Sequence, residues 1–246
     1  MSLPTPDRAP VRALVFDVFG TVVDWRGTIV REGEALSAAK GWHVDWPAFA
    51  DAWRAGYQPA MQGVMQARAS GDTAWVKLDA LHRGILDTLL PRFGLDALSE
   101  AERDHLNLVW HRLDPWPDAV AGLTRLKARF PIATLSNGNV SLLVDMARHG
   151  GLPWDCVLSA ELFRAYKPSP AVYRGAADLL GIAPAELLMV AAHPSDLAAA
   201  QRAGLKTAYV ERPLERGPDG VRESSAGQRF DWVASDFIDL AARLGA

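Results

Sequence analysis

Short apolar runs alternate along the chain with longer amphipathic stretches. The apolar runs are bounded by polar residues, Gly or Pro, and cover 13–16, 132–135, 156–158, 187–191, 207–210 and 232–234. Helix-length amphipathic stretches separate the runs of the second half, at 141–149, 171–180 and 196–203. Strands that alternate with helices predict βαβ units and a mostly parallel sheet. We therefore expect an α/β protein whose ligands bind at the carboxyl ends of the strands.

The segment 29–111 follows a different pattern and has no convincing strand. Helical periodicity is found there instead, near 28–40, 46–69, 74–93 and 100–111. We predict an all-helical cap at 29–111, inserted after the first strand. Residues 1–28 and 112–246 would then form a doubly wound, Rossmann-like catalytic core.

Composition and charge restrict the class of protein further. The 246 residues, 49% hydrophobic and 22% charged, suffice for a large core plus an insert. A formal net charge of −3 gives no broad basic surface for nucleic acid. Cys156 is the only cysteine, which excludes an intramolecular disulfide or a Cys-rich zinc site and fits a reducing cytoplasm.

Two segments bear on location and mobility. Residues 1–12 contain no apolar stretch of signal-peptide length, and no apolar run approaches the roughly 20 residues that span a bilayer. We expect a soluble, cytoplasmic protein without membrane or nucleic-acid partners. Residues 211–229 are rich in Pro, Gly, Ser and charge, which predicts a mobile surface loop.

The first candidate for chemistry is the stretch LVFDVFGTVVDW at 14–25. Its apolar strand ends at Asp17, and a Gly-Thr turn follows at Gly20 and Thr21. A carboxylate in this position can be approached closely by a substrate and can act as a nucleophile. It can equally cap the following turn through its own side chain, and Thr21 has the same ordinary alternative. Position alone leaves both interpretations open.

Two further groups follow later in the chain. Ser136 and Asn137 come directly after an apolar run, where hydroxyl, amide and backbone N–H groups can hold an anion or simply form a turn and cap a helix. Lys167 precedes Pro168, which favours an extended residue before it, so that Lys167 projects from a loop. Tyr173 follows on the next predicted helix. A lone lysine of this kind is ordinarily a surface residue.

The last candidates stand in the sequence MVAAHPSD, which again runs from a buried strand into polar groups. Asp196 can cap the next helix. His193 sits at the strand exit before a proline, a position that a capping role explains less well.

The set D-x-F-G-T-V, then S-N, then K-P, then a final Asp resembles the haloacid dehalogenase superfamily, and within it the L-2-haloacid dehalogenases. The resemblance covers nearly the whole chain, and the helical insert corresponds to that superfamily's cap. Arg54 lies in DAWRAGY on a predicted cap helix, where the family carries a pocket arginine; alone it would be read as a solvated helix residue. The positions that match functional residues of the family are Asp17, Thr21, Arg54, Ser136, Asn137, Lys167, Tyr173 and Asp196.

The resemblance implies a two-step reaction on a small 2-haloacid. Asp17 would attack C2 from the face opposite the halogen and form an ester with inversion. Water would then attack the Asp17 carbonyl carbon and release the 2-hydroxy acid. Ser136 and nearby backbone N–H groups would hold the substrate carboxylate, and Arg54 and Asn137 would receive the halide.

The remaining positions support the nucleophile and the water in the same comparison. Lys167 would offset the charge of Asp17, Asp196 with Lys167 would activate the water, and Tyr173 would position either of them. The resemblance implies no cofactor and suggests a homodimer that acts on a haloacid and releases a halide ion.

Phe19 distinguishes this chemistry from phosphoryl transfer, the commoner activity of the superfamily. Phosphatases carry a second Asp at that position as a proton donor, and Phe19 cannot donate a proton. They also hold Mg²⁺ with several oxygen ligands, whereas HPSD supplies one carboxylate where a phosphatase usually has two. A halide leaves as an anion and needs no proton. We expect Phe19 to form an apolar wall that excludes water beside Asp17, and we expect no metal.

The chain also departs from the dehalogenase pattern. Phe19 stands where many relatives have Tyr, and His193 and Ser195 replace an Asn and an aromatic residue of the pattern S-S-N-x-W-D. Our hypothesis is that His193 narrows the pocket and donates a hydrogen bond to the halide. That would suit haloacetate, including fluoroacetate, as well as L-2-haloacids.

Other activities remain as alternatives. They are a metal-dependent phosphatase, a hydrolase that opens another small α-substituted acid by attack of Asp17, and a binding protein that has lost catalysis. A serine hydrolase built on Ser136, His193 and Asp196 is disfavoured because no G-x-S-x-G sequence surrounds Ser136.

Overall fold

The computed structural model describes residues 10–221 and 223–246. The expectation for the start of the chain therefore lies largely outside the described residues. Within the described ranges, no helix is long and apolar enough to cross a membrane.

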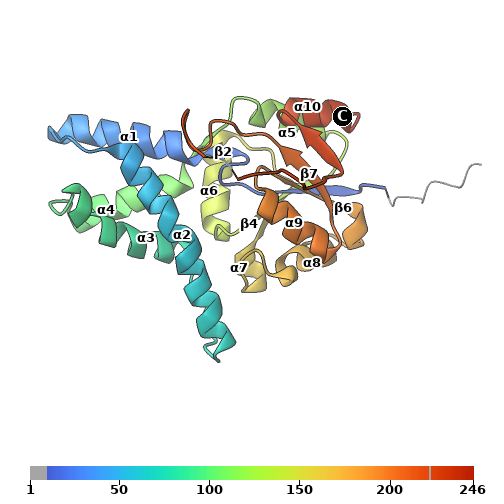
Figure 1. Ribbon diagram of the computed structural model, residues 1–246, viewed down its shortest axis with the longest axis horizontal. Helices are drawn as coiled ribbons and strands as arrows, with labels where there is room; N and C mark the ends of the chain where they lie inside the picture. Colours follow the sequence, from blue (N-terminus) through green and yellow to red (C-terminus); the bar gives the residue numbers. More distant parts are fainter. Residues whose placement is uncertain (1–9, 222) are drawn as a thin grey trace, which may run out of the picture.

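A six-stranded parallel sheet forms the centre of the protein, in the order β5-β4-β1-β6-β7-β8 (Figure 1). Its strands are β1 Ala13–Phe16, β4 Ile132–Ser136, β5 Cys156–Ser159, β6 Leu187–Ala191, β7 Lys206–Val210 and β8 Trp232–Ala234. Each coincides with a predicted apolar run or extends it by one residue. From β1 the chain adds β4 and β5 on one side of the sheet and then β6, β7 and β8 on the other side. In doubly wound sheets, ligands bind at the strand where this direction changes. The predicted α/β class is confirmed.

Helices cover both faces of this sheet because successive side chains of a buried strand point to opposite sides. Leu14 and Phe16 of β1 pack into one core with the helices α5 Ala119–Lys127, α6 Val140–Gly150 and α10 Phe237–Arg243. Val15 packs into a second core with α8 Pro170–Leu179 and α9 Pro194–Ala203. Both faces of β1 are therefore buried, and a ligand can approach this strand at its carboxyl end.

A group of helices lies beyond the carboxyl end of β1 (Figure 1). They are α1 Trp25–Lys40, α2 Trp46–Ala69, α3 Leu78–Leu89 and α4 Glu100–Asn107, with the 3₁₀ turns η1 Pro91–Phe93 and η2 Leu108–His111. Asp24 and Asp45 begin α1 and α2, and each accepts a hydrogen bond from a backbone N–H of the first turn, at 2.8 and 3.0 Å. The helical pattern predicted for 29–111 is present, with α3 shorter than the expected 74–93.

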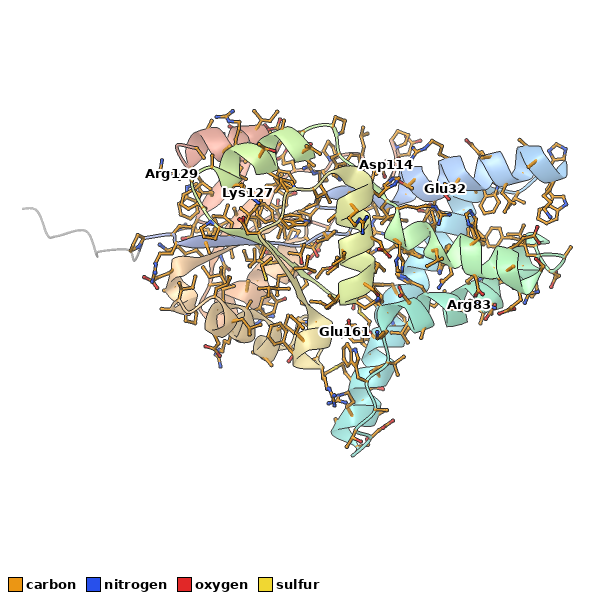
Figure 2. The ribbon with its side chains drawn as sticks, turned by 180° about the vertical axis from the view of Figure 1, so that it is seen from behind. Glu32, Arg83, Asp114, Lys127, Arg129 and Glu161 are labelled. Carbon is orange, nitrogen blue, oxygen red and sulfur yellow. The ribbon has the colours of Figure 1, made fainter. Side chains whose placement is uncertain are left out.

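Polar contacts join these helices to the sheet region. The short strands β2 Val23–Asp24 and β3 Asp114–Pro115 pair antiparallel at the junction. Asp114 pairs with Arg31 of α1 and with His149 of α6. Glu161 of α7 (Ala160–Phe163) pairs with Lys77 at 3.2 Å. Figure 2 shows Asp114 and Glu161 at this boundary.

Several elements were not evident from the sequence. The helices α5, α7 and α10, the turn η3 Pro184–Glu186 and the β2–β3 pair are all short, and periodicity is weak over so few residues. The loop at 211–229 also differs from its prediction. It has no helix or strand among its described residues, yet Arg212 and Glu215 are buried, because each reaches back to partners near β1. That part of the loop is anchored rather than mobile.

Candidate active site

Asp17 is the first residue after β1, at the reversal point of the sheet. Its backbone N–H donates to the carbonyl of Val190 on β6, at 3.0 Å, which extends the strand pairing to the site. Gly20 then turns the chain with a φ of 84°, a value that favours glycine. The turn brings the Thr21 hydroxyl back to donate to Asp17 Oδ2 at 2.7 Å. The carboxylate thus receives a hydrogen bond from the turn rather than capping it.

Lys167 joins the two aspartates that the sequence singled out. Its Nζ donates to Asp17 Oδ1 at 3.0 Å and to Asp196 Oδ2 at 2.6 Å. The Tyr173 hydroxyl donates to Asp196 Oδ1 at 2.5 Å. Asn137 accepts the backbone N–H of Lys167 at 2.7 Å, which fixes the loop that carries the lysine. Four separate segments therefore place one ammonium between two carboxylates.

His193 contacts Asp17 from the opposite side. Its Nδ1 lies 3.0 Å from Asp17 Oδ2, and its Nε2 lies 3.0 and 3.1 Å from the two carboxylate oxygens of Glu215. Trp25 Nε1 also donates to Glu215, at 3.1 Å. A side chain at Gly20 would collide with the Glu215 carboxylate, so glycine is needed there for space as well as for its φ. Sequence reasoning missed Glu215 because nothing in its loop has the periodicity of a buried element.

These neighbours give the two aspartates different acidities. Burial alone would raise the pKa of Asp17, but the charges and hydrogen bonds of Lys167, His193 and Thr21 hold it well below its usual range. Burial together with the negative charge of Asp17 raises the pKa of Asp196, and Lys167 only partly opposes this. Asp17 is therefore a stable carboxylate, while Asp196 is the better proton acceptor.

The histidine is held in its charged form. Burial disfavours the imidazolium, but the charge of Glu215 and the hydrogen bonds to Asp17 and Glu215 outweigh it and raise the pKa of His193 to about 10. Burial alone would raise the pKa of Glu215, but the charge and hydrogen bond of His193, with Arg54 and Trp25, lower it to about 2. At neutral pH both ring nitrogens of His193 carry protons, and each donates to a carboxylate.

Arg54 brings a further positive charge from α2. Its guanidinium lies over the ring of Tyr57, 4.2 Å from the centroid, and Nη1 is buried without a hydrogen-bond partner among the described residues. A buried N–H of a cation without an acceptor is costly unless an anion occupies the space it faces. The helix thus presents a donor to an incoming anion.

A cavity of about 750 Å³ opens between α2 and the carboxyl ends of the strands. Of the predicted site residues, those that line it are Asp17, Arg54, Asn137, Lys167, Tyr173, His193 and Asp196. Its outer wall includes Met61 and Met65, one and two turns beyond Tyr57 on α2. Carboxylates and cations therefore meet in this cavity, and the two methionines give its wall an apolar part.

The acidic groups do not assemble into a metal site. Over the ranges 10–221 and 223–246, no group of three or more His, Cys, Asp or Glu has an arrangement that could hold a metal ion. The carboxylates of the site face cations instead: Lys167 lies between Asp17 and Asp196, and Glu215 faces His193. Each of these carboxylates is therefore already paired with a lysine or histidine side chain.

Comparisons with known proteins agree with this geometry. Residues 11–204 match the haloacid dehalogenase-like hydrolase family. The (S)-2-haloacid dehalogenase 1 of Pseudomonas sp. (strain CBS-3) is 30% identical over 208 residues, which cover 82% of this chain and 86% of that protein. The chain belongs to the haloacid dehalogenase-like hydrolases. Within them it is a member of the L-2-haloacid dehalogenase family, as the resemblance predicted.

Solved structures of haloacid dehalogenases have the same fold. One L-2-haloacid dehalogenase is 47% identical, with a TM-score of 0.90, and the match covers 96% of this chain and 99% of that one. A structure described as a defluorinating L-2-haloacid dehalogenase is 45% identical, with a TM-score of 0.91 over 98% of this chain and 100% of the other.

Three predicted positions of this haloacid dehalogenase-like hydrolase do not reach the cavity wall: Phe19, Thr21 and Ser136. Phe19 is almost fully buried and packs edge to face against Tyr57 and Trp110, with centroids 6.4 and 5.7 Å away. It supports the apolar wall from behind, and Tyr57 forms the surface. The Ser136 hydroxyl accepts the backbone N–H of Gly138 at 3.2 Å and lies inside the turn. It is therefore not placed to hold a substrate carboxylate directly.

The expected role of His193 also changes. A donor to the halide needs a free N–H, but both ring nitrogens of His193 are engaged by Asp17 and Glu215. Arg54, with its unpartnered Nη1, is better placed for an anion. The structure places the histidine between the carboxylates of Asp17 and Glu215.

Proposed function

We propose that the protein hydrolyses small L-2-haloalkanoic acids and haloacetates to 2-hydroxy acids, without a metal ion, through an ester on Asp17. The observation that carries this proposal is the setting of Asp17. Its carboxylate lines a cavity, stays ionised beside Lys167, and has Phe19 two residues later instead of a proton donor. A halide needs no proton to leave, so this arrangement suits displacement at carbon.

In the first step, an oxygen of Asp17 attacks C2 as the carbon–halogen bond breaks, and the halide takes the bonding electron pair. Attack from the face opposite the halogen inverts the configuration at C2. Arg54 and Asn137 line the cavity with groups that can hold the halide or the substrate carboxylate. Their fixed positions supply the orientation on which such a displacement depends.

In the second step, water attacks the carbonyl carbon of the Asp17 ester. Asp196 has the raised pKa that suits a proton acceptor, and Tyr173 and Lys167 hold its two oxygens in place. The 2-hydroxy acid leaves with the oxygen that Asp17 contributed.

Turnover of (S)-2-chloropropionate without added metal tests the proposal. The unaltered enzyme should release chloride, and Asp17→Asn should release none above background. In a single turnover in heavy-oxygen water with excess enzyme, the product should carry no label, and the label should enter Asp17. Chloride release that persists in Asp17→Asn would contradict the ester mechanism, and Mg²⁺-dependent hydrolysis of p-nitrophenyl phosphate would favour a phosphatase.

The range of substrates is part of the proposal. Similarity to a defluorinating L-2-haloacid dehalogenase supports including fluoroacetate. Comparing the rates on chloroacetate and fluoroacetate would measure the effect of the leaving group. Comparing the rates on chloroacetate and 2-chloropropionate would measure the effect of chain length. Absence of fluoride release alongside turnover of chloroacetate would limit the activity to weaker carbon–halogen bonds.

The organisation of the chain completes the proposal. Residues 29–111 would act as the cap and residues 1–28 and 112–246 as the catalytic core, since the cavity lies between α2 and the strand ends. The resemblance to the family also leads us to propose a homodimer. Light scattering on the purified protein would measure the mass of the assembly.

A further inference from the structure

The two carboxylate oxygens of Asp17 have different surroundings. Oδ1 accepts one hydrogen bond, from Lys167 at 3.0 Å. Oδ2 accepts two, from the Thr21 hydroxyl at 2.7 Å and from His193 Nδ1 at 3.0 Å. Hydrogen bonds stabilise the lone pairs of an oxygen, so Oδ1 is the freer nucleophile and Oδ2 the better-stabilised oxygen.

Both donors to Oδ2 are fixed by groups behind them. The backbone N–H of Ala192 donates to Thr21 Oγ1 at 2.9 Å, which directs the hydroxyl proton toward Asp17. Glu215 accepts from His193 Nε2 and is itself held by Trp25 and packed against Gly20. The side chain of Glu215 is only 8% exposed. These donors are in place before any substrate binds.

The consequence appears once an ester has formed through Oδ1, a step that rests on the function proposed above. Oδ2 is then the carbonyl oxygen of the ester and still faces Thr21 and His193. When water attacks the carbonyl carbon, the electron pair of the C=O bond moves to Oδ2, which becomes an oxyanion. Donors already aimed at that oxygen stabilise the charge as it develops.

We infer that Thr21 and His193 form an oxyanion-binding site for hydrolysis of the Asp17 ester, and that Glu215 is the positioning residue that keeps His193 oriented and doubly protonated. Asp196 takes one proton from the attacking water. The bond between the carbonyl carbon and Oδ1 then breaks, and the departing alkoxide receives that proton. The second water proton leaves from the regenerated Asp17 carboxyl to solvent.

The test measures ester formation and ester hydrolysis separately in the variant Glu215→Gln. Gln keeps the size and an acceptor oxygen for His193 but removes the charge that holds the imidazole protonated. With (S)-2-chloropropionate, this variant should release one equivalent of chloride per active site in a rapid burst. Steady-state turnover should then be at least about tenfold slower, with the ester visible as a mass adduct on the acid-quenched protein. His193→Ala, which removes the donor itself, should show the same split with a loss of about 10²-fold.

The matched control is Glu211→Gln, the same change at an exposed position of the same loop. It should match the unaltered enzyme in burst and in turnover. Thermal unfolding and circular dichroism verify that each variant folds, and His193→Ala carries the test if Glu215→Gln does not fold.

Three outcomes would overturn the inference. They are full steady-state turnover in both variants, burst and steady state slowed by the same factor, or slow turnover without an adduct. A different result points to the underlying function: if the unaltered enzyme releases no halide and forms no adduct, the proposed dehalogenation itself fails.

Discussion

Two aspartates that share one lysine differ in acidity because their other surroundings differ. Lys167 contacts both, but Asp17 has further donors in Thr21 and His193, whereas Asp196 has Tyr173. These donors hold the pKa of Asp17 below its usual range against burial, whereas burial and the charge of Asp17 raise the pKa of Asp196. Such separation of paired carboxylates is how one site supplies a nucleophile and a base together.

The charge on His193 predicts a pH dependence of stability. Its pKa is raised from 6.5 to about 10 by folding, so folding retains a proton that the unfolded chain loses over that range. Its contribution is complete below about pH 6.5, declines as the pH rises, and is lost above about pH 10. The free energy of unfolding in urea should therefore fall between these pH values, by a few kcal/mol more than in His193→Asn. Parallel pH profiles for the two proteins would contradict the assignment.

Some residues of the site could be predicted from the sequence, and others could not. Asp17, Lys167 and Asp196 could be predicted because each stands after a strand or at a proline-bounded loop, where parallel sheets gather side chains. Glu215 could not, since its role depends on a loop fold and on the space beside Gly20. The hydrogen bonds of His193 were likewise inaccessible, because spacing along a chain does not say which way a ring points.

Among the elements, strands were better predicted than helices and loops. The runs at β1, β6 and β8 matched their predicted bounds. For β1 and β6 the reason is that buried parallel strands are apolar on both faces. Helices of four to nine residues, such as α7 and α5, give too few turns for a clear pattern. Loop 211–229 has the composition of a mobile segment, but Arg212 anchors it, and composition does not report an ion pair with a distant helix.

The anchor of that loop predicts a large effect of one substitution. Arg212 donates to both oxygens of Asp118 at 2.9 Å, and its Nε donates to the carbonyl of Thr21 at 2.8 Å. Asp118→Asn leaves the arginine buried beside a neutral group, and we expect the free energy of unfolding to fall by about 3–5 kcal/mol. The measurement is urea unfolding monitored by tryptophan fluorescence.

Asp51→Asn is the matched control, because it breaks an exposed pair with Arg26 by the same chemical change. A loss of at most about 1 kcal/mol is expected there. Equal effects at the two positions would mean that Arg212 does not depend on Asp118.

At the scale of the whole molecule, ion pairs between side chains join the part of the chain that contains α1 to α4 to the sheet region. His111 makes one of these contacts, with Asp145. It lies 3.1 Å from Asp79 of α3 and 2.8 Å from Asp145 of α6. Lys77 and Glu161 make a second bridge nearby. Attachment of the helical part to the sheet region is thus partly electrostatic, beside the shared apolar core.

His111 therefore predicts a pH dependence of its own. Burial opposes its charge, but the hydrogen bonds and charges of Asp79 and Asp145 raise its pKa above 6.5. Its stabilising contribution is present below that value and is lost as the pH rises through the raised pKa. The difference in free energy of unfolding between the unaltered protein and His111→Gln should be largest in mild acid and shrink as the pH rises. A difference that stays the same as the pH rises would contradict this assignment.

Loop 211–229 has a practical implication for anyone who alters this protein. Its composition would recommend it as a place to insert an epitope, attach a label or shorten the chain. Among its described residues, two side chains lie in the interior, and one of them, Glu215, contacts the imidazole beside Asp17. An insertion that disturbs residues 212–215 would thus register as a catalytic defect rather than as a harmless change to the exterior.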